Sequence, residues 1–226
     1  MDILLASGNA HKLHEMSAVF PRHRLLTPKD FGVLGFSPIE DAPDFHGNAL
    51  IKARALHAAV IRLRGPDTAV PPILADDSGI CVDALGGGPG ILSARYGADR
   101  ELAPQNDAER TALLLHDLAS VTEPAARAAH YVCAMVVLWS PERFSLAQET
   151  WEGQIAFAPS TGTGGFGYDP VFFLPEHGLT VSELSAEQKN KQSHRGKAAA
   201  RIAPLLELQA AHHLTQSARA ERGAHT

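Results

Sequence analysis

The sequence predicts an α/β fold in which a mixed, twisted sheet is flanked by helices. The chain opens with a short apolar run at residues 3–6, which is followed directly by a turn and a helical pattern. Residues 130–139 form a near-continuous apolar run, which is typical of a central strand buried on both faces. Residues 144–157 alternate between apolar and polar, as expected of an antiparallel partner or an edge strand. Strands and helices therefore interleave along the chain.

Length and composition bound the organisation of the protein. The 226 residues are 45% hydrophobic, which is enough to bury a sizeable core. We expect one domain over residues 1–211 and a flexible, polar tail over residues 212–226. The two cysteines, Cys81 and Cys133, lie in apolar runs and are expected to be free buried thiols, not a disulfide framework or a zinc site.

Charge and hydropathy restrict the partners and the compartment. The net charge of −5 implies no general affinity for nucleic acid or for an anionic membrane. No apolar window approaches the roughly 20 residues of a membrane span, and the N-terminal run lacks the pattern of a signal peptide. The sequence therefore predicts a cytoplasmic protein without a nucleic-acid or membrane partner.

The N-terminal segment reads as a strand, a turn and a helix. The apolar run at residues 3–6 is broken by Ser7-Gly8-Asn9, whose asparagine is a good N-cap for a helix over residues 11–20. Backbone N–H groups and Lys12 then lie at a helix N-terminus, which suits an anion. The segment is not a Walker A loop, because that motif is absent. An ordinary strand-to-helix turn remains the alternative.

Two amphipathic helices follow. One spans residues 48–64, with an apolar stripe and with Lys52 off it. The other spans residues 106–119, where Asn106 is followed by a glutamate three positions later, as in a capping box. The loop before the first helix carries the acidic pair Glu40-Asp41, for which a solvated loop is the simplest interpretation.

Two adjacent carboxylates, Asp76 and Asp77, stand out in the middle of the chain. They follow the apolar run 73–75, which reads as a short buried strand, and a second β-like run follows at residues 80–85. Charge at the end of a buried strand is costly unless it is paired, and a divalent cation is one such partner. Side chains alternate along a strand, so the two carboxylates are not expected to reach the same ion.

A glycine-rich segment, Gly162–Gly167, matches the letters of the dinucleotide fingerprint G-x-G-x-x-G. That interpretation is rejected, because the fingerprint requires a following helix and Pro170 with β-forming residues follows instead. The glycines are better explained by close approach of the backbone to a ligand. Phe166 and Tyr168 flank Asp169 and suit a flat ring with a polar edge. A glycine-rich β-turn without a ligand remains the alternative.

A basic cluster lies near the end of the chain, within residues 189–197. Ser193 is a good cap for a final helix, which places His194 and Arg195 in its first turn. Cations there oppose the helix dipole, an arrangement that makes sense if the site holds phosphate. A solvated basic helix start is the alternative. Pro204 is expected to kink this helix or to restart it.

Together these features predict metal-dependent phosphate chemistry. Hard carboxylate oxygens without a thiolate cluster suit Mg²⁺ or Mn²⁺ bridged to phosphate. The cations would neutralise the charge that grows toward a phosphoryl-transfer transition state. A carboxylate beside the metal could also orient or deprotonate water. The residues by themselves name neither the nucleotide nor the bond.

Seven motifs, in order from residue 3 to about residue 210, resemble those of the inosine/xanthosine triphosphate pyrophosphatases (dITP/XTP diphosphatases), which remove non-standard purine nucleotides. The motifs are Leu5-Ala-Ser-Gly-Asn-Ala-His-Lys-Leu, Asn48-Ala-Leu-Ile-Lys-Ala, Leu74-Ala-Asp-Asp-Ser-Gly, Ala84-Leu-Gly-Gly-Gly-Pro-Gly, Ser93-Ala-Arg-Tyr, Gly164-Gly-Phe-Gly-Tyr-Asp-Pro, and Lys189-Asn with Ser193-His-Arg. The resemblance implies two lobes around a central cleft and a homodimer. It also implies hydrolysis of ITP, dITP and XTP between the α and β phosphates, with Mg²⁺ or with Mn²⁺ in its place.

The resemblance also assigns roles to residues of this sequence. Asp77 is implied as the proton acceptor for the attacking water and as a metal ligand, with Glu40 as a second metal ligand. Asp76 is implied as support, and Lys52 and Arg95 as further contacts to the polyphosphate. The implied substrate-binding residues are Ser7, Gly8, Asn9, Lys12, Ser78, Phe166, Gly167, Tyr168, Asp169, Lys189, His194 and Arg195.

Two rival functions remain at this stage. One is a pyrophosphatase of similar fold that acts on modified pyrimidine or methylated nucleotides. The other is a nucleotide-binding regulator that does not catalyse hydrolysis, against which the intact carboxylate pair and the complete basic cluster argue. Pyrophosphate release from dITP, XTP, dTTP and dUTP separates the three.

Overall fold

The computed structural model describes residues 1–223, with the backbone alone for residue 11 and residues 212–223. The strands are β1 (Asp2–Leu5), β2 (Arg24–Leu26), β3 (Ile73–Val82), β4 (Ala128–Ser140), β5 (Arg143–Ile155), β6 (Phe172–Leu174) and β7 (Leu179–Thr180). The α-helices are α1 (Ala10–Val19), α2 (Phe45–Arg64), α3 (Asp107–Asp117), α4 (Ala186–Gln192) and α5 (His194–Gly223). The 3₁₀ turns are η1 (Pro28–Phe31), η2 (Asp83–Leu85), η3 (Gly90–Arg95), η4 (Pro124–Arg127) and η5 (Val181–Glu183).

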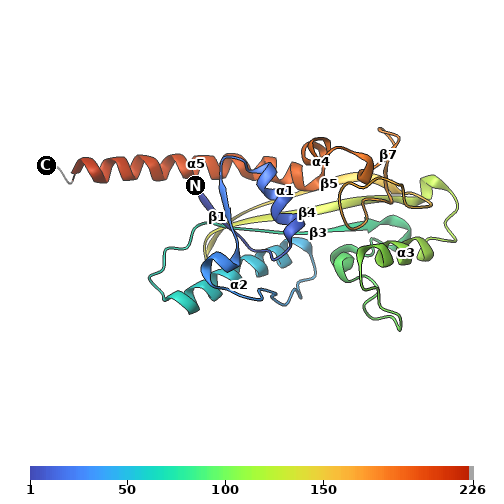
Figure 1. Ribbon diagram of the computed structural model, residues 1–226, viewed down its shortest axis with the longest axis horizontal. Coiled ribbons are helices and arrows are strands. Elements are labelled where there is room, and N and C mark those ends of the chain that lie inside the picture. Colours follow the sequence, from blue (N-terminus) through green and yellow to red (C-terminus); the bar gives the residue numbers. More distant parts are fainter. Residues whose placement is uncertain (224–226) are drawn as a thin grey trace.

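All seven strands form one mixed sheet, in the order β2-β1-β3-β4-β5-β6-β7. β2, β1 and β3 are parallel neighbours, and every pair from β3 to β7 is antiparallel. The long strands β3, β4 and β5 run through most of the molecule (Figure 1). The predicted α/β fold with a mixed sheet is therefore confirmed.

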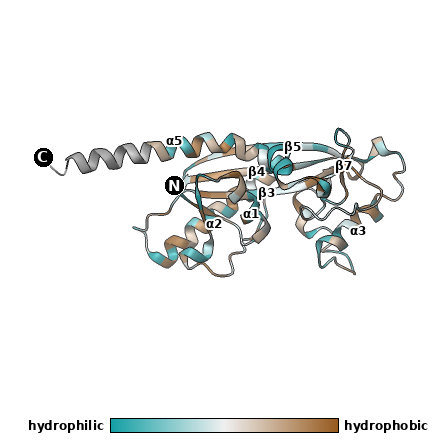
Figure 2. Ribbon diagram, turned by 45° about the horizontal axis from the view of Figure 1, so that its top comes forward, coloured by the Kyte–Doolittle hydropathy of each residue, from teal (hydrophilic) through white to brown (hydrophobic). Residues whose placement is uncertain are grey.

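At one end of the long strands, helices cover both faces of the sheet. α1 and α5 pack on one face, against a core that includes Leu74 and Met135. α2 packs on the other face, against a core that includes Ala75 and Val136. Figure 2 shows hydrophobic colour on the strands beside β4 and on parts of α2. Neighbouring residues of β3 thus face different helices.

A separate core fills the other end of the long strands. It joins Ile80 and Val82 of β3 to Leu114 of α3 and to Phe172 of β6. Figure 1 shows α2 and α3 near opposite ends of the long strands. The cores on the two faces of the sheet form one lobe and this separate core forms the other. The two lobes share β3, β4 and β5, and the middle of β3 lies where they meet.

β3 corrects one expectation from the sequence. The two carboxylates were expected at the end of a short strand, but β3 is continuous and Asp76 and Asp77 lie in its middle, opposite Met135 and Ala134 of β4. The strand continues because β4 pairs with the backbone of this region while other elements supply cationic partners to the carboxylates. At Gly79 the strand packs so closely on η3 that a Cβ atom would overlap the carbonyl oxygen of Gly90.

The C-terminal helix begins as the sequence predicts. The Ser193 hydroxyl accepts a hydrogen bond of 3.1 Å from the Gly196 N–H. α5 continues through Pro204 without restarting. It also continues through residues 212–223, whereas residues 224–226 lie outside the described part of the chain, so the flexible tail over 212–226 stays a prediction.

Two further expectations concern the cysteines and the membrane. Cys133 is buried and Cys81 is half-buried, and both are free thiols. Within residues 1–223, no helix combines the length and the apolar character needed to cross a bilayer.

Candidate active site

A cavity of about 400 Å³ opens beside the middle of β3, between the two lobes. That volume is in the range of small-molecule sites. Every site residue proposed from the sequence lines it except Arg95: Ser7, Gly8, Asn9, Lys12, Glu40, Lys52, Asp76, Asp77, Ser78, Phe166, Gly167, Tyr168, Asp169, Lys189, His194 and Arg195. Residues from both ends of the chain and from its middle therefore meet at one site.

Asp77 points to the face of the sheet that α2 covers. Its Oδ1 atom lies 2.8 Å from Lys52 Nζ, which also lies 2.9 Å from Glu40 Oε2. Its Oδ2 atom accepts a longer hydrogen bond of 3.4 Å from Asn48 Nδ2. Burial raises the pKa of Asp77, and the opposing charge of Lys52 does not fully offset it. The result is a carboxylate of increased basicity on the wall of the cavity.

The loop that carries Glu40 is fixed at several points. The Ala42 N–H donates to Asn48 Oδ1 at 3.0 Å, and Asn48 is fully buried. Arg95 donates to the main-chain carbonyl of Glu40 at 3.1 Å. Arg95 was proposed as a phosphate contact, but in the structure its guanidinium holds the Glu40 loop and does not line the cavity.

Asp76 points to the opposite face, toward α1 and α5. Its carboxylate pairs with Lys12 at 3.0 Å and with Arg195 at 3.2 Å. Burial alone would raise the pKa of Asp76, but Lys12 and Arg195 outweigh burial and hold this pKa well below its usual range. Arg195 also donates to the Ser78 hydroxyl at 2.9 Å. Asp76 is therefore a permanent anion that orients cations at the cavity.

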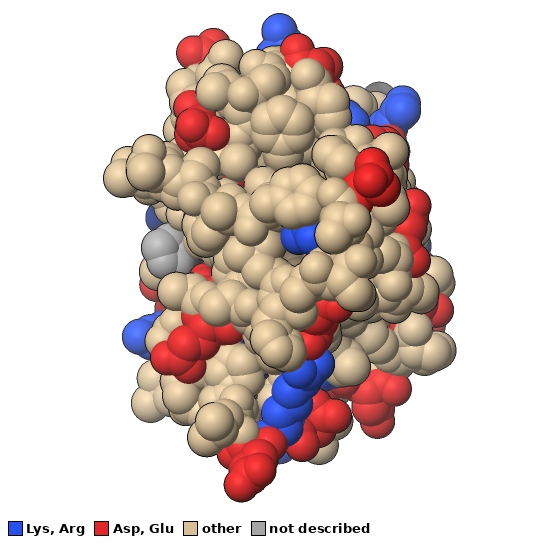
Figure 3. Space-filling model, turned by 90° about the vertical axis from the view of Figure 1, so that its right-hand side faces the viewer, with Lys and Arg blue, Asp and Glu red and all other residues tan. Residues whose placement is uncertain are grey.

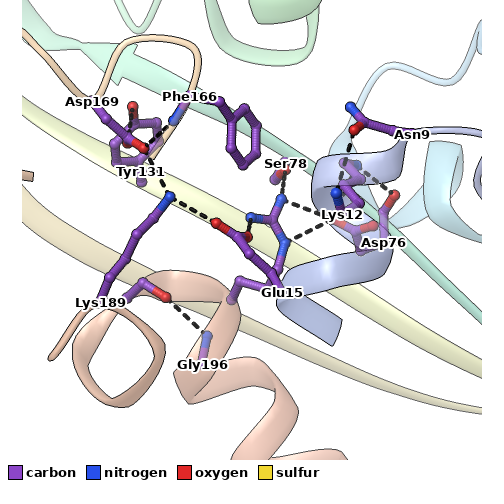
Figure 4. A network of polar contacts seen from close by, with 12 residues as sticks. Asn9, Lys12, Glu15, Asp76, Ser78, Tyr131, Phe166, Asp169, Lys189 and Gly196 are labelled. Carbon is purple, nitrogen blue, oxygen red and sulfur yellow. Dashed lines mark hydrogen bonds and ion pairs between the residues drawn. The ribbon is translucent and has the colours of Figure 1, made fainter. Parts of the chain in front are cut away.

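The turn before α1 has the expected local structure. The Ser7 hydroxyl accepts from the Asn9 N–H at 3.1 Å, and Asn9 Oδ1 accepts from the Lys12 N–H at 3.3 Å. These bonds fix the first turn of α1 and bring Lys12 beside Asp76, as Figure 4 shows. Backbone N–H groups at a helix start and a nearby ammonium group form an environment that favours an anion.

Asp169 anchors the glycine-rich wall of the cavity. It accepts hydrogen bonds from the Phe166 N–H, from Lys189 Nζ and from the Tyr131 hydroxyl, at 2.8, 2.8 and 3.2 Å. Gly165 has φ +74°, and a Cβ atom there would overlap the Asp169 carboxylate. The segment leads through a turn into β6 and not directly into a helix, so rejection of the dinucleotide fingerprint is confirmed.

The basic residues of the C-terminal cluster are held in place by a carboxylate from α1. Glu15 pairs with Lys189 at 2.8 Å and with Arg195 at 2.5 Å. Figure 4 shows Lys189 reaching both Glu15 and Asp169. Lys189 Nζ also lies 4.7 Å from the ring centroid of Phe166. Lys189 and Arg195 are thus buried, paired parts of the site, whereas Lys191 of the same cluster is exposed.

His194 lines the cavity and is itself buried. Its ring stacks on Tyr131, with ring centroids 4.6 Å apart and planes inclined by 10°. Its Nδ1 atom is buried and has no hydrogen-bond partner within the part of the chain that the structure describes. Burial lowers the pKa of His194 well below its usual value, and the charge of Arg195 lowers it further. A neutral imidazole can donate a hydrogen bond from one ring nitrogen and accept at the other, depending on its tautomer.

Sequence reasoning missed three residues that position the site: Asn48, Tyr131 and Glu15. Asn48 and Glu15 lie inside or beside recognised motifs, but their partners are far away in the sequence. Tyr131 lies in an apolar run, where an aromatic residue normally indicates core packing. The one available signal was a polar or amphipathic side chain on an otherwise apolar strand or helix face.

The donor chemistry of the site fits a hard divalent cation. Asp77 and Glu40 present oxygens to one shared point, which Lys52 Nζ marks. Among the side chains that the structure describes, no group of three or more His, Cys, Asp and Glu forms a metal cage. Mg²⁺ commonly uses one or two carboxylates and completes its shell with water and substrate phosphates. Two carboxylates beside an anion-binding cavity meet that requirement.

Comparison with known proteins gives a consistent picture. The model of the Ham1 family matches residues 3–205. The chain is 46% identical over 198 residues to the dITP/XTP pyrophosphatase of Treponema denticola, covering 88% of this chain and 94% of that protein. It is 39% identical over 208 residues to the dITP/XTP pyrophosphatase of Geobacillus kaustophilus, covering 89% and 92%.

Solved structures agree with these sequence matches. The HAM1 protein of Coxiella burnetii superposes with a TM-score of 0.75 at 34% identity, covering 92% of this chain and 98% of that one. The Ham1 protein of Staphylococcus aureus gives the same TM-score at 31% identity, covering 92% and 100%.

Proposed function

The chain belongs to the Ham1 family, and on this premise we propose that it is a pyrophosphatase that hydrolyses non-standard purine nucleoside triphosphates (ITP, dITP and XTP) to the monophosphate and pyrophosphate. Relatives named dITP/XTP pyrophosphatase, at 39% and 46% identity, support the substrate class. One observation of this structure carries the proposal. The carboxylate of Asp77 faces a cavity whose walls bring together Lys12, Lys189 and Arg195.

Asp77 acts as the general base in the proposed reaction. Its raised pKa suits removal of a proton from water that attacks the α phosphorus, with pyrophosphate as the leaving group. Asp77 and Glu40 would hold Mg²⁺, or Mn²⁺ in its place. When bound, the ion supplies Lewis-acid polarisation and charge neutralisation at the phosphates.

The cationic residues bind and orient the triphosphate. Lys12 lies at the start of α1, and the N–H groups of the Ser7-Gly8-Asn9 turn lie beside it. Asp76 fixes Lys12 and Arg195 in place before the substrate arrives, so little ordering remains to be done on binding. Preorganised cations of this kind stabilise the charge that develops in the transition state.

The far wall of the cavity suits a purine. Phe166 offers a flat ring, and the neutral imidazole of His194 lines the same cavity. Hypoxanthine and xanthine carry a 6-oxo group where adenine carries an amino group, so a site that donates there leaves adenine poorly matched. Arg195 and a donating tautomer of His194 meet this requirement. Tyr168 and Gly167 complete this wall.

We also propose that the protein is a cytoplasmic homodimer that uses neither nucleic acid nor membrane. The acidic net charge of −5 argues against binding to nucleic acid or to an anionic membrane. Figure 3 shows that acidic and basic side chains are interspersed on the α3 and β7 end of the molecule, without a continuous basic surface. We further propose that residues 1–211 are one folding domain.

The decisive experiment is pyrophosphate release from a panel of dITP, XTP, ITP, dTTP, dUTP, ATP and GTP, with and without Mg²⁺. We expect hydrolysis of the first three at rates well above the others, and none after chelation. Preference for a pyrimidine would favour the rival pyrophosphatase. Binding of dITP without pyrophosphate release would favour the regulator.

A further inference from the structure

The Lys52 ammonium group occupies the point that the two carboxylates of the proposed metal site share. Its Nζ atom lies 2.8 Å from Asp77 Oδ1 and 2.9 Å from Glu40 Oε2. The Lys52 side chain is only 9% exposed, so it is packed in place and does not sample solvent freely. It extends from α2, one helical turn after Asn48, which itself contacts Asp77.

A divalent ion and Lys52 cannot both occupy this point. Mg²⁺ binds carboxylate oxygens at about 2.1 Å, so an ion shared by Asp77 and Glu40 lies almost where the ammonium nitrogen lies. Two cations at that separation repel each other strongly, and the two carboxylates cannot compensate both. Binding of the ion therefore requires that the ammonium group leave.

We propose that Lys52 is a built-in counter-ion that blocks the metal site in the nucleotide-free protein and moves to the polyphosphate when metal and nucleotide bind together. This inference rests on the proposed function for the metal and the nucleotide. Lys52 then neutralises the carboxylate pair in one state and the substrate in the other, and the site never contains an unpaired charge. Metal and nucleotide must consequently each strengthen the binding of the other.

The other cations of the cavity do not play this part. Lys12 pairs with Asp76, which faces the opposite side of β3 and is not shared with the proposed metal. Arg195 is fixed by Asp76 and Glu15. Lys52 is the cation that binds both carboxylates in question, so its removal gives a specific test and Lys12 gives a matched control.

The test measures Mn²⁺ binding without nucleotide, by the electron paramagnetic resonance signal of free Mn²⁺, in the wild type and in Lys52→Met and Lys12→Met. Loss of a unit charge beside the ion should tighten Mn²⁺ binding by roughly tenfold or more in Lys52→Met. Lys12→Met should change it much less. Circular dichroism and thermal unfolding verify that each variant is folded. If Lys52→Met does not fold, Lys52→Gln takes its place. Unchanged or weaker Mn²⁺ binding in a folded Lys52 variant would overturn the proposal.

A second measurement tests the linkage. The α,β-imido analogue of dITP should tighten Mn²⁺ binding markedly in the wild type and much less in Lys52→Met, since the block is already removed. Equal coupling in both proteins would count against the proposal. The two hypotheses fail separately. If the wild type does not hydrolyse dITP, the proposed function is refuted. If the wild type hydrolyses dITP but Lys52→Met binds Mn²⁺ no more tightly than the wild type, only the counter-ion role of Lys52 is refuted.

Discussion

Asp76 and Asp77 are adjacent in the sequence, yet their carboxylates lie on opposite faces of β3 and have different partners. Asp76 pairs with Lys12 from α1 at 3.0 Å, and Asp77 pairs with Lys52 from α2 at 2.8 Å. The pKa of Asp76 is lowered by its cations, whereas burial raises that of Asp77. The alternation of a strand thus separates one charged dipeptide into a structural anion and a basic carboxylate.

This division predicts two different defects. Asp77→Asn should lower kcat for dITP by about 10²- to 10⁴-fold, as for loss of a general base, with little change in thermal stability. Asp76→Asn removes the counter-charge of Lys12 and Arg195, so it should lower the free energy of unfolding by about 3 kcal/mol. Steady-state kinetics and urea unfolding of both variants check this. Equal effects of the two variants on kcat and on unfolding would contradict the division of roles.

Much of the fold was predictable because hydrophobic periodicity is local. Residues 130–139 were recognised as a central strand and lie within β4, and the predicted helix at 106–119 corresponds to α3. The continuity of β3 was not predictable in this way. Its charged middle reads as a strand end until the cations of α1, α2 and α5 are known, and those cations come from distant parts of the chain.

The site shows the same limit. Nearly all the site residues that the family resemblance implied do line the cavity. Their supports were not found. Arg95 was expected at the phosphates but donates to the Glu40 carbonyl, 55 positions away in the sequence. Pairings of this kind are fixed by the tertiary fold, and no spacing rule reveals them.

Asn48 should act as a positioning residue for the metal site. It joins the backbone of the Glu40 loop, through Ala42, to Asp77. Asn48→Ala should weaken Mn²⁺ binding and lower kcat/KM by about 10-fold or more, as for loss of a group that orients metal ligands. The control is Asn106→Ala, which removes the N-cap of α3 and should lower stability by about 1 kcal/mol without weakening Mn²⁺ binding. Similar Mn²⁺ affinity in both variants would refute this role.

The Tyr131 hydroxyl should matter for the nucleotide and not for the chemical step. It donates to Asp169, while its ring supports His194. Tyr131→Phe keeps the ring stack and loosens the wall that Asp169 anchors, so KM for dITP should rise several-fold with kcat nearly unchanged. Tyr131→Leu removes the stack as well and should lower kcat/KM further. A fall in kcat with unchanged KM in Tyr131→Phe would show that the hydroxyl acts on the reaction itself. Both values come from one series of initial rates.

Burial of His194 should make stability depend on pH. Burial, Arg195, Lys189 and Lys12 all favour the neutral ring in the folded protein, and only Asp76 opposes them.

The sign of this effect follows from the protons that each state binds. The folded pKa of His194 is lowered, whereas the unfolded chain takes up a proton near pH 6.5. The contribution to stability is therefore complete above about pH 6.5 and is lost as the pH falls toward the folded pKa, by up to about 1.4 kcal/mol for each pH unit. His194→Gln should flatten this dependence between pH 7 and pH 5 in urea unfolding, relative to the wild type. His116→Gln, whose ring is exposed on α3, should retain it. If unfolding of both variants keeps the wild-type dependence on pH, His194 is not the group that titrates. The neutral His194 imidazole proposed beside the purine then loses its support.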